Sequence, residues 1–313
     1  MRVDVHAHYF KDEYLDLLVR FGSKGTDIAR GLGAGATPKE LQNRFKLMDE
    51  AGVKMQLLSV SPQLPYFENK AHAVEAARVA NDLYAELVRR HPDRFFALAA
   101  VPLPHVEASL RELARALDDL GMLGVTIATT VLGHSIADPA FEPFYKELNK
   151  RGTVLYVHPA GVGADSPFIS RYNLTWPIGA PIEDTIAVMH LIMRGIPMRY
   201  PKIRIINSHL GGALPMLLQR LDNQCKWAVP ETPELPSVAA RRMWYDTATH
   251  AYIPALHAAI ESLGPDRLLL GTDFPYQTGG FYKRSVTYIN NAGLSKGDSS
   301  RIMDRNASTL LTP

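Results

Sequence analysis

The chain has 313 residues, of which 46% are apolar and 21% charged, so it can bury a sizeable core as a soluble globular protein. Its formal net charge of +2 gives no electrostatic case for nucleic acid or an anionic membrane surface, which leaves a small molecule as the expected partner. Cys225 is the only cysteine, which excludes an intrachain disulfide and a multi-cysteine metal cluster. We expect its thiol to pack as a small apolar group.

The N-terminal segment MRVDVHAHYF enters a strand pattern directly, with no apolar signal region before it. No run of about 18 apolar residues occurs along the chain, so no transmembrane helix is expected. These two observations predict a cytoplasmic protein.

Eight short β-rich segments follow one another along the chain, and most are continuous apolar runs, as expected for strands buried on both faces. They span residues 2–8, 53–60, 95–101, 124–128, 153–158, 203–208, 243–246 and 267–272.

Helical patterns alternate with these strands. They cover residues 38–51, 71–90, 106–120, 141–151, 182–199, 214–227 and 252–263, and Thr37 and Gly52 stand where the first should be capped and end. This alternation predicts a closed (β/α)₈ (TIM) barrel that forms a single domain over residues 1–313. The alternative fold is an open doubly wound sheet, which usually carries a glycine-rich phosphate turn after its first strand. Here that position is occupied by HAHYF.

Two long connections, residues 9–36 and 159–181, follow the first and fifth predicted strands. In a barrel both would lie at the catalytic face as lid or pocket material. The second contains Phe168, Tyr172 and Trp176, which could stack on a planar substrate, with Trp176 as the candidate contact. Packing within the loop explains these aromatic residues equally well.

His6 and His8 stand two residues apart on the first predicted strand. Side chains at i and i+2 of a strand point to the same side, so both imidazoles can face the barrel interior and bind one metal ion. A pair of hydrogen-bonded core histidines is the alternative for this motif alone.

Three further residues strengthen the metal hypothesis. His158, His209 and Asp273 stand at or directly after the ends of the fifth, sixth and eighth predicted strands. Barrel enzymes place their catalytic groups at these strand ends, and chance would rarely deliver so many ligand-type residues to one mouth.

These motifs resemble the amidohydrolase superfamily. The segments DVHAHYF, LYVHP, NSHLGGALP and LLLGTDFP are similar to the branch that contains aminocarboxymuconate-semialdehyde, resorcylate and carboxyvanillate decarboxylases, and the resemblance covers essentially the whole chain. It implies that His6, His8, His158 and Asp273 are metal ligands and that His209 is the acid/base group.

The resemblance also implies residues that bind substrate. Arg44, in LQNRFKLMDEAGV, matches the arginine that grips the substrate carboxylate in the aminocarboxymuconate enzyme. Arg220, in LLQRLDN, is similar to an arginine that family dimers can supply from the neighbouring subunit, although an ordinary surface arginine fits this position as well. The resemblance thus implies a homodimer.

The number and kind of metal ions follow from the same motifs. Binuclear members of the superfamily use a lysine at the end of strand four, whereas this strand reads GVTIATT, so one divalent ion is expected. We expect zinc, with manganese as the alternative, because three histidines and an aspartate exclude neither. Asp246, at the end of the seventh strand, could orient a ligand histidine or be a buried structural acid.

Two reactions suit this set of residues. The branch resemblance favours non-oxidative decarboxylation of a small aromatic or conjugated carboxylic acid, with His209 moving the proton. The alternative is hydrolysis of a small amide, lactone or ester, in which Asp273 or His209 takes the proton. A barrel that only binds a ligand is the third hypothesis. It is disfavoured because all five key positions carry chemically competent residues.

Overall fold

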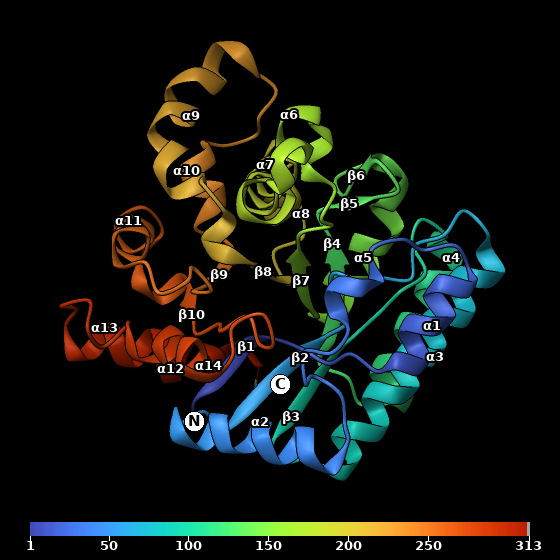
Figure 1. Ribbon diagram of the computed structural model, residues 1–313. Coiled ribbons are helices and arrows are strands. Elements are labelled where there is room, and N and C mark those ends of the chain that lie inside the picture. Colours follow the sequence, from blue (N-terminus) through green and yellow to red (C-terminus); the bar gives the residue numbers. More distant parts are fainter. Residues whose placement is uncertain (312–313) are drawn as a thin grey trace.

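The computed structural model describes residues 1–311, whose centre is a ring of eight parallel strands wrapped by helices (Figure 1). The strands are β1 (Val3–His8), β2 (Met55–Ser59), β3 (Phe95–Ala99), β4 (Gly124–Ala128), β7 (Val154–His158), β8 (Arg204–Asn207), β9 (Trp244–Asp246) and β10 (Leu268–Leu269). They pair in parallel in this order, and a small antiparallel hairpin follows β4, formed by β5 (Thr130–Val131) and β6 (His134–Ser135).

The ring is closed between β1 and the segment that follows β10. The backbone N–H of Val5 donates to the carbonyl of Leu270 at 2.8 Å, and that of His8 donates to Phe274 at 2.8 Å. Ala7 and Phe274 form a parallel bridge. The predicted closed barrel is therefore confirmed, and the open doubly wound sheet is excluded.

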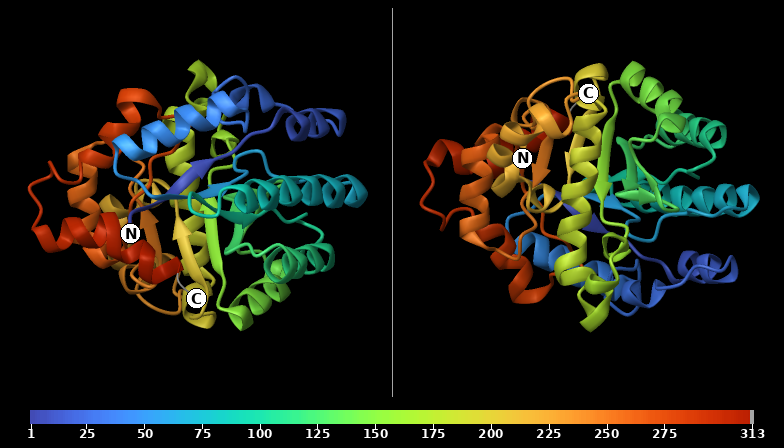
Figure 2. Two further views of the ribbon diagram at one scale, coloured as in Figure 1. Left: turned by 90° about the horizontal axis from the view of Figure 1, so that it is seen from below. Right: turned by 90° about the horizontal axis from the view of Figure 1, so that it is seen from above.

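Helices cover the outside of the ring, and in both views of Figure 2 they flank the strands on either side. They are α1 (Asp12–Arg20), α2 (Pro38–Glu50), α3 (Lys70–Arg90), α4 (Val106–Ala114), α5 (Glu142–Arg151), α6 (Pro167–Ser170), α7 (Ala180–Met193), α8 (Ile196–Arg199), α9 (Leu214–Ala228), α10 (Pro236–Ala240), α11 (Ile253–Leu263), α12 (Gly279–Thr287), α13 (Lys296–Ser300) and α14 (Asn306–Leu311). None of the helices in the described part of the chain is both long and apolar enough to cross a membrane.

Local sequence explains several of these boundaries. Thr37 accepts a hydrogen bond from the Glu40 backbone and forms a capping box at the start of α2, as its position predicted. The helix predicted over residues 182–199 is instead two helices, because Gly195 adopts φ 65° between α7 and α8. The strand predicted over 267–272 is regular only in β10.

The interior of the barrel is an apolar layer to which six of the eight strands contribute buried side chains. Its buried members are Val3, Val5, Met55, Leu57, Leu98, Val154, Tyr156, Ile206 and Leu269, together with Ala307, Leu310 and Leu311 of α14. Since Val3 begins β1, α14 closes the end of the barrel where the strands start. The opposite end of the barrel, formed by the carboxyl ends of the strands, is not covered by α14 and is called the mouth below.

A bulge in β1 turns its histidines toward the interior. From Asp4 to Ala7 the strand advances three residues, while its partner β2 advances only two, from Gln56 to Leu58. Val5 therefore packs in the interior layer, and yet His6, the next residue, also faces the mouth. Simple alternation along β1 predicted that His6 and His8 share a face, but it did not predict this bulge.

Candidate metal centre and active site

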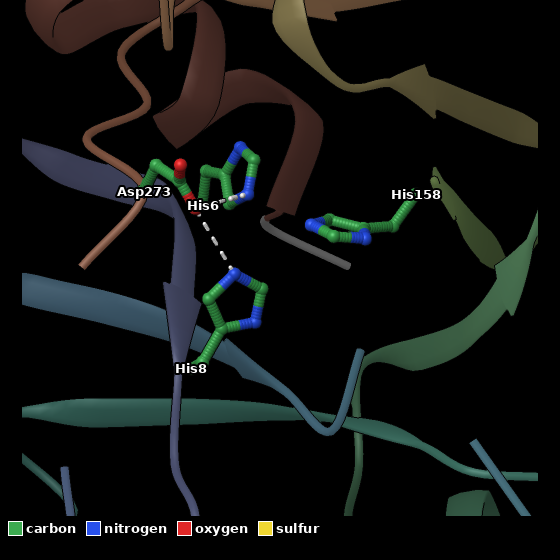
Figure 3. Close-up of side chains that lie close together, drawn as sticks. All are labelled: His6, His8, His158 and Asp273. Carbon is green, nitrogen blue, oxygen red and sulfur yellow. Dashed lines mark hydrogen bonds and ion pairs between the residues drawn. The ribbon is translucent and has the colours of Figure 1, made fainter. Parts of the chain in front are cut away.

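Four side chains converge at the mouth, and together they are called the four-donor cluster below. His6 and His8 come from β1, His158 from the end of β7, and Asp273 from the segment after β10 (Figure 3). One potential ligand atom from each lies within 4.8 Å of all the others. Asp273 Oδ1 lies 3.2 Å from His6 Nε2 and 3.3 Å from His8 Nε2.

Hydrogen bonds fix which imidazole nitrogen is free to bind a metal. His158 Nδ1 lies 3.0 Å from the carbonyl of Pro159, which can only accept, so Nδ1 carries the proton and Nε2 is the free lone pair. His6 Nδ1 lies 3.0 Å from Asp246 Oδ2, and the buried His6 Nε2 makes no well-directed hydrogen bond among the described residues, although Asp273 Oδ1 lies 3.2 Å away. A buried nitrogen so placed, beside two other imidazoles and a carboxylate, fits a divalent cation.

The electrostatics of the four-donor cluster also favour a cation. Burial opposes charge on His6, but Asp246 and Asp273 together raise its pKa well above the usual value. Burial and the neighbouring histidines lower the pKa of His158 far below that of a free imidazole, and burial likewise lowers that of His8. His8 and His158 are thus held neutral, the state in which an imidazole binds a metal ion, while Asp246 and Asp273 attract positive charge to the position of His6.

Asp246 supports both the ligands and the residue that follows β8. Its Oδ2 accepts hydrogen bonds from His6 and from the Tyr156 hydroxyl at 2.8 Å, and its Oδ1 accepts from the backbone of His209 at 3.1 Å. Burial alone would raise the pKa of this carboxyl. The charge of His6 and its hydrogen bond outweigh that effect, so the pKa is lower than usual. Its bond to His6 is the contact that the hypothesis of an orienting carboxylate requires.

His209 lies beside the four-donor cluster and not within it. Its ring centroid is 5.0 Å from that of His6 and 5.7 Å from that of His158. Its side chain is 18% exposed, whereas His6 and His8 are fully buried. This position suits a group that exchanges protons with a bound ligand, as the resemblance implied, better than a fourth imidazole ligand.

Asp184, on α7, is the functional residue that sequence reasoning missed. Its Oδ2 lies 2.8 Å from His209 Nδ1, and its Oδ1 accepts a hydrogen bond from the Ser208 hydroxyl at 2.9 Å. Burial raises its pKa to about 6, although His209 counteracts this effect. The signal in the sequence was an adjacent acid pair, Glu183–Asp184, at the start of an otherwise apolar helix.

The backbone is strained at His209 and Asp273, two residues of the candidate site. His209 and Leu210 adopt φ 50° and 58°, and Asp273 adopts φ 65°. Residues other than glycine rarely adopt this left-handed conformation. Such conformations persist when surrounding contacts fix them. The hydrogen bonds of His209 to Asp184 and Asp246, and of the Asp273 N–H to the His6 carbonyl at 2.9 Å, provide those contacts.

Arg44 makes no contact with the side chains of the four-donor cluster, and its guanidinium reaches the backbone of His8 instead. Its side chain is 1% exposed and packs between α2 and the outer face of the barrel wall. Nε donates to Gln56 Oε1 at 2.7 Å, Nη1 donates to the His8 carbonyl at 2.9 Å, and the guanidinium stacks over the ring of Phe274. Burial lowers its pKa to about 10, which still leaves it charged at neutral pH.

This arrangement predicts a structural effect for Arg44→Met. The substitution leaves the His8 carbonyl and the Gln56 amide oxygen without their donors, so the free energy of unfolding should fall by about 1–3 kcal/mol. The KM for a carboxylate substrate should stay unchanged, since the guanidinium does not face the mouth. Urea unfolding and steady-state kinetics, with the exposed Arg89→Met as control, test this prediction. A raised KM at normal stability would return Arg44 to substrate binding.

Trp176 borders a cavity formed by the loops that follow several of the barrel strands. The cavity, of about 400 Å³, lies over the ends of β2, β4 and β7, and its lining includes Tyr66, Ala128, Ala160 and Trp176. Trp176 is 37% exposed, and its ring packs so closely on Gly161 that an added Cβ would lie 2.6 Å from it. The other aromatic residues of the connection 159–181, Phe168 and Tyr172, are highly exposed.

Arg220 is exposed on α9, and Cys225 is buried there as expected.

Glu183 holds the first part of the lid, residues 159–181, to α7. Its two carboxylate oxygens accept hydrogen bonds from the backbone N–H groups of residues 160–164, at 2.8 to 3.4 Å, and from Thr129 Oγ1 at 2.9 Å. This side chain is 2% exposed, and its charge is matched by converging N–H dipoles. Glu183 therefore determines the path of the chain directly after His158.

Replacing Glu183 by glutamine should loosen the lid. An amide cannot accept on both sides, so some N–H groups lose a charge-assisted partner worth about 1.5–3 kcal/mol, or about 10–100-fold in the opening equilibrium. Trypsin cleavage after the exposed Arg171 should accelerate accordingly, while the exposed Glu107→Gln should cleave at the wild-type rate. Equal cleavage of both variants would show that Glu183 does not restrain the lid.

Comparison with known proteins identifies the family. Residues 3–312 match the amidohydrolase family, and the chain belongs to it. It is 27% identical over 301 residues to the 2-amino-3-carboxymuconate-6-semialdehyde decarboxylase of Dictyostelium discoideum, covering 89% of this chain and 83% of that protein. It is 30% identical to the gamma-resorcylate decarboxylase of Rhizobium sp. strain MTP-10005, covering 87% and 89% of the two chains.

The fold comparison agrees with these relatives. The crystal structure of a 2,6-dihydroxybenzoate decarboxylase in complex with 2,6-dihydroxybenzoate superposes with a TM-score of 0.83 at 25% identity, covering 99% of this chain and 98% of the other. The resemblance inferred from the four motifs, including the decarboxylase branch, is thus confirmed.

Proposed function

We propose that this protein is a metal-dependent, non-oxidative decarboxylase of a small aromatic or conjugated carboxylic acid. One observation carries the proposal: an imidazole with a hydrogen-bonded carboxylate, His209, lies beside a four-donor cluster suited to a cation, in a chain whose relatives are decarboxylases. Hydrolysis, the alternative from the sequence, has no such support from the relatives.

One divalent ion is proposed at His6, His8, His158 and Asp273. Three imidazoles and a carboxylate suit zinc best, and manganese is the alternative. When bound, the ion would supply a Lewis acid that polarises an oxygen of the substrate and stabilises the negative charge that develops there.

His209 is proposed to move the proton. Its Nε2 would deliver the proton to the ring or alkene carbon that carries the carboxylate, so a C–H bond forms at that carbon. The C–C bond to the carboxylate then breaks, its electron pair returns to the conjugated system, and CO₂ leaves. Asp273 holds His6 and His8 in place at 3.2 and 3.3 Å and borders the same space, so it is counted with His209 among the catalytic residues.

Trp176 is proposed to contact the substrate. Its partly exposed ring lines the cavity together with Tyr66 and with Ala160, two residues after His158, and two aromatic side chains suit a planar acid.

A homodimer is proposed as the assembled state. Large apolar side chains on α9, Met216 and Trp227, are 76% and 71% exposed on the same helix as Arg220. Such exposed apolar groups are typical of an interaction surface. Light scattering in solution tests the assembly. A monomer would remove any role for Arg220 in a neighbouring site.

The function is tested by metal analysis coupled to an activity panel. Purified protein, loaded separately with zinc and with manganese, is assayed on hydroxybenzoates, a muconate semialdehyde acid, lactones and amides, and CO₂ release is followed separately from hydrolysis. About one ion per chain with CO₂ release supports the proposal. About one ion per chain with hydrolysis and no CO₂ release would show that the protein is a hydrolase that uses the same metal site. Failure to bind metal would overturn the ligand assignment.

A further inference from the structure

Asp184 makes a direct contact with the proton-carrying imidazole from outside the barrel strands. It lies on the buried side of α7, 1% exposed, and its Oδ2 is 2.8 Å from His209 Nδ1. The second oxygen accepts a hydrogen bond from Ser208, the residue before His209. Both oxygens of one carboxylate are thus directed at the same turn after β8.

This contact determines which nitrogen of His209 can act. A carboxylate only accepts hydrogen bonds, so His209 Nδ1 must carry a proton, and the nitrogen left for chemistry is Nε2. The ring stands 5.0 Å from His6 and 5.7 Å from His158, measured between centroids, so it lies against the four-donor cluster. The neutral ring and the imidazolium both keep the bond to Asp184, so the direction of the ring is the same before and after proton transfer.

The helix that carries Asp184 is fixed to the turn that carries His209. Gly212, at φ 66°, passes so close to α7 that an added Cβ would lie 1.8 Å from the Pro181 carbonyl oxygen. Thr185 Oγ1 accepts a hydrogen bond from the backbone of Ala213 at 2.8 Å. The distance from Asp184 to His209 is therefore set by a rigid contact between two elements.

The two buried acids near His209 have separate tasks. Asp246 accepts from the backbone N–H of His209 and from the ring of His6, so it supports the metal side of the site. Asp184 bonds the ring of His209 itself.

We propose that Asp184 is a positioning residue, which holds His209 in the Nδ1–H tautomer with Nε2 toward the substrate. This inference rests on the proposed function only in that His209 is the proton carrier. The geometry of the pair does not depend on which substrate is bound.

The kinetic test compares Asp184→Asn with Ser208→Ala. An asparagine amide can donate to Nδ1 and so stabilise the opposite tautomer, and kcat should fall by about 10²–10⁴-fold. KM and metal content should remain at wild-type values, since the four-donor cluster is untouched. Ser208→Ala removes only the second bond of Asp184 and should lower kcat by less than tenfold. An Asp184→Asn enzyme with normal kcat would overturn the proposal.

A second readout needs no activity. Long-range ¹H–¹⁵N NMR of the metal-loaded protein, with His209→Asn to assign the signals, reports which nitrogen of His209 is protonated. The wild type should show the Nδ1–H form and Asp184→Asn the Nε2–H form. The same tautomer in both proteins would overturn the proposal. If the tautomer changes as expected but the protein releases no CO₂ from any acid tested, the positioning role of Asp184 stands. The proposed decarboxylase function is then overturned.

Discussion

Replacing Asp273 by alanine should remove the metal and the activity together. Its Oδ1 lies within 3.3 Å of both His6 and His8, so the carboxylate supplies the one anionic donor of the four-donor cluster. Loss of that donor leaves three neutral imidazoles for a divalent ion. The expected result is a metal content well below one ion per chain and a fall in kcat/KM of about 10³-fold or more, equal to several kcal/mol of transition-state stabilisation.

Elemental analysis and the decarboxylase assay on the same preparation measure both effects. The exposed Asp93→Asn serves as control, because it removes a carboxylate of the same kind from the surface. Full metal content in the Asp273 variant would show that this residue is not a ligand. Activity that returns at high metal concentration would show that its contribution is binding alone and not catalysis.

Replacing His209 by asparagine should abolish turnover while the metal stays bound. The ring lies outside the four-donor cluster and has its own carboxylate partner in Asp184, so the ligand set remains complete without it. Removal of a general acid lowers kcat by about 10²–10⁴-fold.

The measurement is kcat together with metal content, with the exposed His257→Asn as control. Loss of the ion from the His209 variant would contradict the assignment and make His209 a ligand. Unchanged kcat would assign the proton transfer to another group.

The sequence predicted the frame of this site well, because strand ends in a parallel barrel all open at one mouth. Alternation on the first strand predicted that His6 and His8 share a face, and strand ends placed His158, Asp273 and Asp246 near them, as the structure shows. Such reasoning needs only a count of strands and the direction in which each runs.

The sequence could not predict side-chain contacts that depend on how helices pack against the barrel. Asp184 lies on a helix, and only the close approach of Gly212 to α7 brings it to His209. Arg44 lies on α2, and the position of its guanidinium is set by contacts with Gln56 and Phe274. Neither outcome leaves a periodic signal in the chain.

The closure of the ring has a consequence for how the protein holds together. His6 and His8 come from the first strand and Asp273 from the segment after the last, so an ion at these residues would join the two ends of the sheet across its seam. The seam itself depends on a few backbone hydrogen bonds and on β10, the shortest strand of the ring. The ion would then link the two ends of the sheet as well as serve the reaction, so metal depletion would weaken this seam of the barrel.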